Sequence, residues 1–237
     1  MCCLSEELVA TREAFGGLCR GREVKLRTNP VIDVPTCFKT IFNTLKAEDK
    51  ILTVRTSLFE GVRKIYGLKD VEGIFNLDEK HIQYIVYKAL LGMIGDYRVY
   101  MEDPYPYKER GKKCCDITIY TSDWRGAVWI EIKTTGWCSP GKYKEWTRAD
   151  AQKLRHSKKG ASKYLLVTSI EDGEQDGTEW NKWFRNFKGV KFDANLFGSF
   201  FSHEFKDGNK TVKGYYTVCL LKVISHKTKG RIEWLSH

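Results

Sequence analysis

The sequence predicts an α/β protein built around a mixed β-sheet. Segments with apolar residues at helical spacing alternate with short apolar segments of strand length, and in the middle of the chain their order is helix, three strands, helix, strand. The chain has 237 residues, of which 42% are hydrophobic, so it can bury a core without disulfides. We divide it into a mostly helical region, residues 1–75, and a second region, residues 76–237, that contains the sheet.

The first region is expected to contain amphipathic helices. Residues 37–45 place four apolar side chains at positions i, i+3, i+4 and i+7, and a second apolar set continues the pattern at residues 58–66. Twelve basic and ten acidic residues leave the region nearly neutral. Two short helices could form a helix-turn-helix, but helix pairs are too common for this pattern to favour DNA recognition here.

The second region is expected to begin with a helix that opens at Asp78 and Glu79 and ends at Gly95. A turn at residues 102–104 should close the strand that follows this helix. The elements expected after the helix are strands at 97–101, 115–121 and 127–134, a basic helix at 146–159, a buried strand at 164–168, an acidic loop at 171–176, a short helix around residue 183, and strands near 198–205 and 214–224.

Three ionisable residues share one face of the hairpin predicted at residues 115–134. Alternate residues of a strand point the same way, so Glu131 and Lys133 lie together. A turn centred between residues 124 and 125 would place Asp116 opposite Lys133 and Thr118 opposite Glu131. This grouping depends on the register, because a slip of one residue would turn one strand over.

Two carboxylates on adjacent strands form a hard oxygen site suited to Mg²⁺. Such an ion can polarise a phosphodiester and lower the pKa of a bound water, and a nearby lysine can orient that water or balance negative charge. The alternative is a surface hairpin with a cross-strand ion pair, worth a few tenths of a kcal/mol. The apolar strands around these residues and the basic helix after them favour the functional interpretation.

Asp116 followed by Glu131-Ile132-Lys133 resembles the motif of the PD-(D/E)XK nuclease superfamily, which includes many restriction endonucleases. The resemblance covers residues 77–168, and it departs from the usual motif at Cys115, where proline is common. It implies a restriction-endonuclease-like core of a helix, three antiparallel strands, a helix and a further strand. It also implies that Asp116 and Glu131 bind one or two Mg²⁺ ions, for which Mn²⁺ can substitute, and that Lys133 assists the attacking water.

The same family often adds an acidic residue from the first core helix as a further metal ligand. Glu79 fits this role, because it lies on the apolar stripe of the predicted helix with Ile82 and Val86. A glutamate in the first turn of a helix is equally well explained by the helix dipole. Both interpretations of Glu79 are kept.

Positive charge is concentrated directly after the proposed active strand. Residues 133–163 hold nine basic and two acidic side chains, which gives +7 of the chain's net charge of +10. The residues expected to contact the phosphate backbone are Arg148, Gln152, Arg155 and Lys159 on one helix face, with Lys142 and Lys144 before them. The alternative is a solvated helix face.

Together these features predict a Mg²⁺-dependent nuclease that hydrolyses DNA. The first candidate subclass is a restriction-type endonuclease. Cutting both strands of DNA would then imply a homodimer. Two alternatives stay open: a repair or recombination nuclease of the same fold, and a non-catalytic nucleic-acid-binding protein with structural carboxylates. The charged N-terminus and the lack of a long apolar run predict a cytoplasmic protein with no membrane partner and eight reduced cysteines.

Overall fold

The structure is a computed structural model. It describes residues 32–58, 74, 77–93, 97–106, 113–124, 127–134, 140–154, 160–171, 173–174, 177, 184, 190–207, 209–224 and 234–235. Among these residues no helix is long and apolar enough to cross a membrane.

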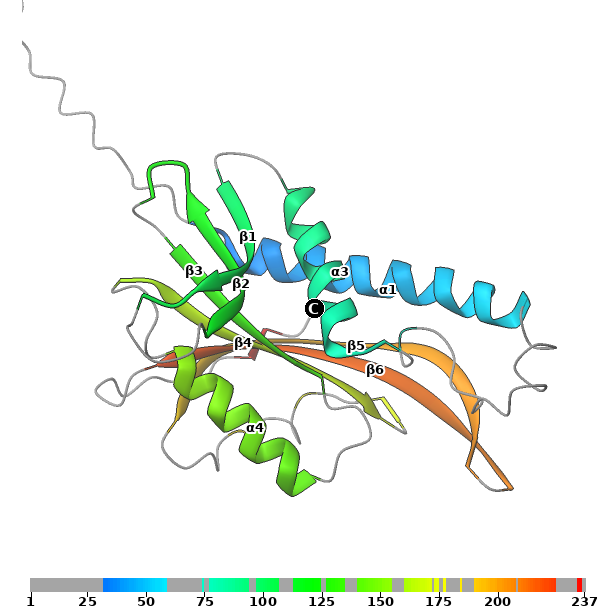
Figure 1. Ribbon diagram of the computed structural model, residues 1–237. Coiled ribbons are helices and arrows are strands. Elements are labelled where there is room, and N and C mark those ends of the chain that lie inside the picture. The colour runs from blue at the N-terminus through cyan, green and yellow to red at the C-terminus, as the bar shows by residue number, and fades with distance from the viewer. Residues whose placement is uncertain are drawn as a thin grey trace, which may run out of the picture.

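A seven-stranded mixed sheet forms the centre of the described molecule (Figure 1). Its spatial order is β1-β2-β3-β4-β6-β5-β7, in which β3–β4 and β5–β7 are parallel pairs and all other neighbours are antiparallel. The strands are β1 (Tyr97–Pro104), β2 (Cys114–Thr121), β3 (Ala127–Thr134), β4 (Ser162–Glu171), β5 (Lys191–Asp207), β6 (Lys210–Ile224) and β7 (Trp234–Leu235).

Two helices cover one face of this sheet, α1 (Val34–Leu58) and α3 (Glu79–Leu91) (Figure 1). The carboxylate of Asp78 caps α3 by accepting a hydrogen bond from the N–H of His81 at 2.9 Å. The side chains that pack into the core from these helices include Phe38, Ile41, Leu45, Ile82, Val86 and Ala89. Because α1 and α3 share one core with the strands, the described part of residues 1–75 packs directly on the sheet.

A third helix, α4 (Pro140–Lys153), covers the opposite face and connects β3 to the parallel strand β4 (Figure 1). Ala151 of this helix and Leu154, which follows it, pack against Trp129 and Leu165 in a second buried cluster. The central strand β3 is therefore covered on both faces, as expected for a strand in a parallel pair. The side chains of β3 that point away from α1 and α3 lie under α4 rather than in open solvent.

The predicted α/β class and the order of helix, three strands, helix and strand are confirmed by α3, β1, β2, β3, α4 and β4. The helix expected at 37–45 is part of α1, a single helix of 25 residues. The predicted strands near 198–205 and 214–224 are confirmed as parts of β5 and β6. The second apolar set at 58–66, the acidic loop and the short helix around residue 183 lie largely outside the described residues.

Several predicted boundaries were wrong. Helix α3 ends at Leu91 with Gly92 as its C-cap, three residues before the predicted stop, and α4 begins at Pro140 instead of residue 146. The expected turn at 102–104 is instead the end of β1, because the carboxylate of Asp103 accepts hydrogen bonds from two hydroxyl groups on β2, those of Thr118 at 2.9 Å and Tyr120 at 2.6 Å.

The register of the β2–β3 hairpin also differs from the prediction. Thr118 pairs with Trp129 rather than with Glu131, a shift of two residues. The cause is the turn, which closes early through a hydrogen bond from the N–H of Trp124 to the carbonyl of Thr121 at 2.9 Å. Because side chains alternate with a period of two, this shift keeps Glu131 on the expected face of the sheet.

Candidate functional site

The carboxylate of Asp116 lies at the point where the regular pairing of β2 with β3 ends. The last paired residues are Ile117 and Ile130, and the Asp116 carboxylate accepts a hydrogen bond from the N–H of Ile132 at 2.7 Å. On its other side, the amide of Gln83 from α3 donates to the carbonyl of Asp116 at 2.9 Å. The side chain of Asp116 is therefore fixed against β3, beside Glu131.

Glu131 is a buried carboxylate, with only 2% of its surface exposed. The hydroxyl of Tyr105 donates to one of its oxygens at 2.5 Å, and the ammonium of Lys153 lies 3.6 Å from the other. Burial first and the negative charge of Asp116 second raise the pKa of Glu131 to about 8, against the opposing effect of Lys153. Burial also raises the pKa of Asp116, although its bond from the Ile132 amide opposes the rise.

Lys133 lies between two carboxylates that come from different helices. Its ammonium is 2.9 Å from Glu79 on α3 and 3.1 Å from Asp150 on α4. Burial alone would lower the pKa of Lys133, but these two negative charges raise it, so the side chain is a cation at neutral pH. The structure thus brings Glu79 to Lys133, and the Glu79 carboxylate also accepts from the N–H of Thr134 at 3.4 Å.

Three residues that contact the predicted site residues were not predicted from the sequence: Tyr105, Asp150 and Lys153. Lys153 pairs with Asp150 one turn earlier on α4 as well as with Glu131. Tyr105 follows β1 and stacks on Trp129, with 5.1 Å between ring centroids. The sequence signal for Asp150 was its helical spacing with the apolar residues Ala151 and Leu154, a stripe that the structure buries.

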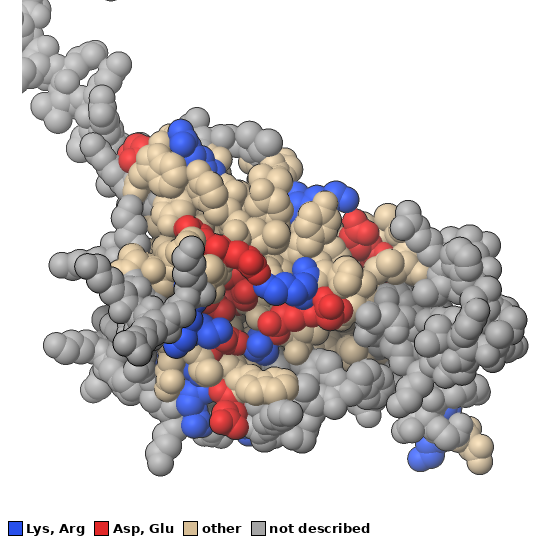
Figure 2. All heavy atoms as spheres, in the orientation of Figure 1, with Lys and Arg blue, Asp and Glu red and all other residues tan. Residues whose placement is uncertain are grey.

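The charges of this cluster do not balance. Figure 2 shows acidic and basic side chains next to one another in the region between α3 and α4. The cluster consists of the carboxylates of Glu79, Asp116, Glu131 and Asp150 and the ammonium groups of Lys133 and Lys153. With all six groups ionised, the cluster carries a formal excess of two negative charges. The neighbouring carboxylates add to the effect of burial, which is the larger cause of the raised pKa values of Asp116 and Glu131.

The donor set fits a divalent cation at Asp116 and Glu131. An excess of two negative charges is what one Mg²⁺ would offset, and Mg²⁺ is commonly held by one or two carboxylates with water and phosphate as its other ligands. The described residues contain no group of three or more His, Cys, Asp or Glu side chains arranged to hold a metal ion. This agrees with the placement of Glu79, whose carboxylate is directed to Lys133 rather than to the two central carboxylates.

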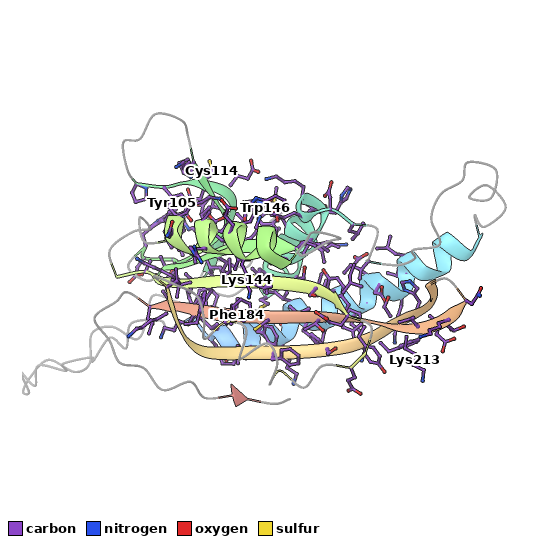
Figure 3. The ribbon with its side chains drawn as sticks, turned by 90° about the horizontal axis from the view of Figure 1, so that it is seen from below. Tyr105, Cys114, Lys144, Trp146, Phe184 and Lys213 are labelled. Carbon is purple, nitrogen blue, oxygen red and sulfur yellow. The ribbon has the colours of Figure 1, made fainter. Side chains whose placement is uncertain are left out.

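The predicted phosphate-contacting residues are only partly described. Arg148 is half-buried on α4, with a buried Nε that has no hydrogen-bond partner among the described residues, and Gln152 is exposed on the same helix. Lys144 is half-buried near the start of α4 (Figure 3). The side chains predicted for this role that lie outside the described residues are those of Lys142, Arg155 and Lys159.

Comparison with known proteins adds no family assignment. No protein-family model, no curated protein and no solved structure matches the chain.

Proposed function

We propose that this chain is a Mg²⁺-dependent nuclease that hydrolyses DNA phosphodiester bonds, with α3, β1, β2, β3, α4 and β4 as a restriction-endonuclease-like core. The observation that carries the proposal is the convergence of Asp116, Glu131 and Lys133 at one end of the β2–β3 hairpin. The restriction-type endonuclease remains the proposed subclass, and two copies of the chain would then cut the two strands of a duplex.

In this proposal Asp116 and Glu131 hold the cation, and the remaining groups of the cluster position it and the substrate. When bound, Mg²⁺ supplies a Lewis acid that polarises the phosphodiester and lowers the pKa of a water. Tyr105 fixes one oxygen of Glu131 by its hydrogen bond. Arg148 on α4 and the basic residues that follow it are proposed to contact the phosphate backbone, which gives binding that weakens as salt rises.

The proposed role of Lys133 follows from its charge. Because Glu79 and Asp150 raise the pKa of its ammonium, Lys133 is already protonated and cannot act as a general base at neutral pH. It instead donates hydrogen bonds to the attacking water or to a phosphate oxygen that gains charge in the transition state. Glu79 and Asp150 are positioning residues for this ammonium group.

Incubation of supercoiled plasmid with the purified chain tests the proposal. With Mg²⁺ we expect nicked or linear plasmid, and with EDTA we expect none. A plasmid that stays supercoiled with Mg²⁺ or Mn²⁺, but migrates more slowly because the chain is bound, would contradict the proposal and support a non-catalytic nucleic-acid-binding protein.

The affinity for Mg²⁺ should rise with pH up to about 8. A cation binds the ionised form of Glu131, and the pKa of that carboxyl is about 8 in the cation-free protein, so at lower pH binding must first release a proton. We expect the Mg²⁺ concentration for half-maximal cleavage to fall by roughly tenfold per pH unit between pH 6 and 8 and then to level off. A concentration that stays constant from pH 6 to 8 would contradict this coupling.

A further inference from the structure

An exposed aromatic surface lies at the outer edge of the sheet, on β1 and on the turn after β2. Trp124 in the turn is 41% exposed and Tyr100 on β1 is 39% exposed. Their rings are stacked, with centroids 5.9 Å apart and an angle of 27° between the planes. The guanidinium of Arg98 lies 5.0 Å from the centroid of the Trp124 ring. We call these three side chains, Arg98, Tyr100 and Trp124, the aromatic platform.

The backbone at Trp124 is strained. Its φ of 61° lies in the left-handed region, where glycine and asparagine are favoured and bulky residues are rare. Burial does not explain the choice of a tryptophan, because two fifths of this side chain is exposed. Strain at a residue that the core does not require is more common at functional sites than elsewhere. The indole is therefore a candidate for contact with a ligand.

A chain of ring contacts through the buried interior connects the platform to the candidate metal site. Its Trp124 ring lies 5.0 Å from Tyr120, which makes an edge contact with Trp129 at 6.4 Å, and Trp129 in turn stacks on Tyr105. Tyr105 is the residue that donates its hydroxyl hydrogen to Glu131. Tyr120 is four residues from Asp116 along β2, or roughly 13 Å at the rise of a strand.

We propose that the platform stacks an unpaired nucleobase of the nucleic acid that the metal site cleaves. A base presents a flat π face of the kind that Trp and Tyr bind, and Arg98 adds a cation for the neighbouring phosphate. In a duplex the faces of the bases are hidden by stacking on one another, so the partner is a single-stranded end, a flap or a melted stretch. This inference rests on the proposed nuclease function and narrows its substrate class.

The test is equilibrium binding in EDTA, where no cleavage occurs. Labelled duplexes with a blunt end or with a short single-stranded overhang are titrated with the chain. The wild type should bind the overhang duplex more tightly than the blunt duplex. In Trp124→Ala the ratio of the two affinities should fall by roughly 5- to 100-fold, the range expected for the stacking of one base. Trp124→Gly should lose this preference equally but should be more stable than Trp124→Ala, because glycine accepts the positive φ. Trp124→Tyr should retain most of the preference.

The control for an exposed aromatic residue is Phe201→Ala. Phe201 is 49% exposed on β5, which is separated from β1 by four strands of the sheet. This variant should bind both duplexes like the wild type. In addition, an abasic nucleotide in the overhang should reduce wild-type binding as much as Trp124→Ala does, and should cause no further loss in that variant.

Two results would overturn the inference. One is a Trp124→Ala chain that prefers the overhang as strongly as the wild type. The other is a Trp124→Ala chain that loses self-association in sedimentation and shows no base-dependent change, which would make the platform an interface between copies. A wild type that shows the Trp124-dependent preference but never cleaves DNA would contradict the nuclease proposal alone. A wild type that cleaves DNA without this preference would contradict the platform alone.

Discussion

Glu131→Gln should reduce Mg²⁺-dependent cleavage by roughly 100- to 1,000-fold or more. Glutamine keeps the size of the side chain and can still accept the hydrogen bond from Tyr105, but it has no charge to hold a cation. Plasmid cleavage with Mg²⁺, followed over time for the wild type and the variant, measures the loss. Full activity in the variant would contradict the assigned role of Glu131.

The same variant should alter how the stability of the metal-free protein depends on pH. The pKa of Glu131 rises from 4.5 to about 8 on folding, so between these values the folded carboxyl holds a proton that the unfolded one has released. Wild-type stability should therefore fall as pH rises through this window, and Glu131→Gln should remove that part of the fall. In urea unfolding with EDTA, we expect the variant to gain on the order of a few kcal/mol relative to the wild type between pH 5 and 8.

Glu145→Gln is the matched control, because Glu145 is an exposed carboxylate on α4. Its cleavage rate and its stability at both pH values should match those of the wild type. A Glu131→Gln protein whose stability falls between pH 5 and 8 as steeply as that of the wild type would show that the carboxyl is not held in the protonated form.

Lys133→Met should damage both cleavage and folding. The change removes the ammonium that lies between Glu79 and Asp150 and leaves their carboxylates to repel one another. Removing one partner of the buried Lys133–Asp150 pair costs about 3 kcal/mol. The loss of the donor to water or phosphate should slow cleavage by roughly 100- to 1,000-fold. Urea unfolding and the plasmid assay measure the two effects separately.

Lys133→Arg separates the effect of the positive charge on stability from the effect of the lysine on cleavage, and Lys213→Met is the control. The arginine keeps the positive charge between the two carboxylates, so it should restore most of the stability but less of the activity, since its fork of donors is shaped differently. Lys213 is an exposed lysine on the β5–β6 hairpin, far from Tyr105 (Figure 3), and its replacement should change neither quantity. Wild-type cleavage by Lys133→Met would show that this lysine is structural only.

Much of the fold was accessible from the sequence because its elements have clear periodicity. The apolar alternation of β2 and β3 and the stripe of α3 are local signals, and they placed these elements correctly except for the end of α3. The details that were wrong depend on contacts between elements. The extension of β1 depends on bonds from β2 to Asp103, and the hairpin register depends on a turn that closes at Trp124.

The sequence predicted the part of the candidate site that lies on the β2–β3 hairpin. Asp116, Glu131 and Lys133 are close in the sequence and share a face, so strand geometry alone groups them. Asp150 and Lys153 belong to the cluster because α4 crosses over β3, and no local pattern gives the direction of that crossing. The helix face that carries Arg148 and Gln152 was expected to contact the phosphate backbone. Gln152 is exposed, whereas Asp150 on the same helix points to Lys133.

The central claim is that Asp116 and Glu131 hold a divalent cation, and Mn²⁺ binding measured by electron paramagnetic resonance tests it most directly. Asp123→Asn, a change at an exposed aspartate in the hairpin turn, is the control. We predict at least one Mn²⁺ site per chain in the wild type and in the control, displaced by Mg²⁺, and weakened at least roughly tenfold in Asp116→Asn. Equal Mn²⁺ binding by the wild type and Asp116→Asn would contradict the claim.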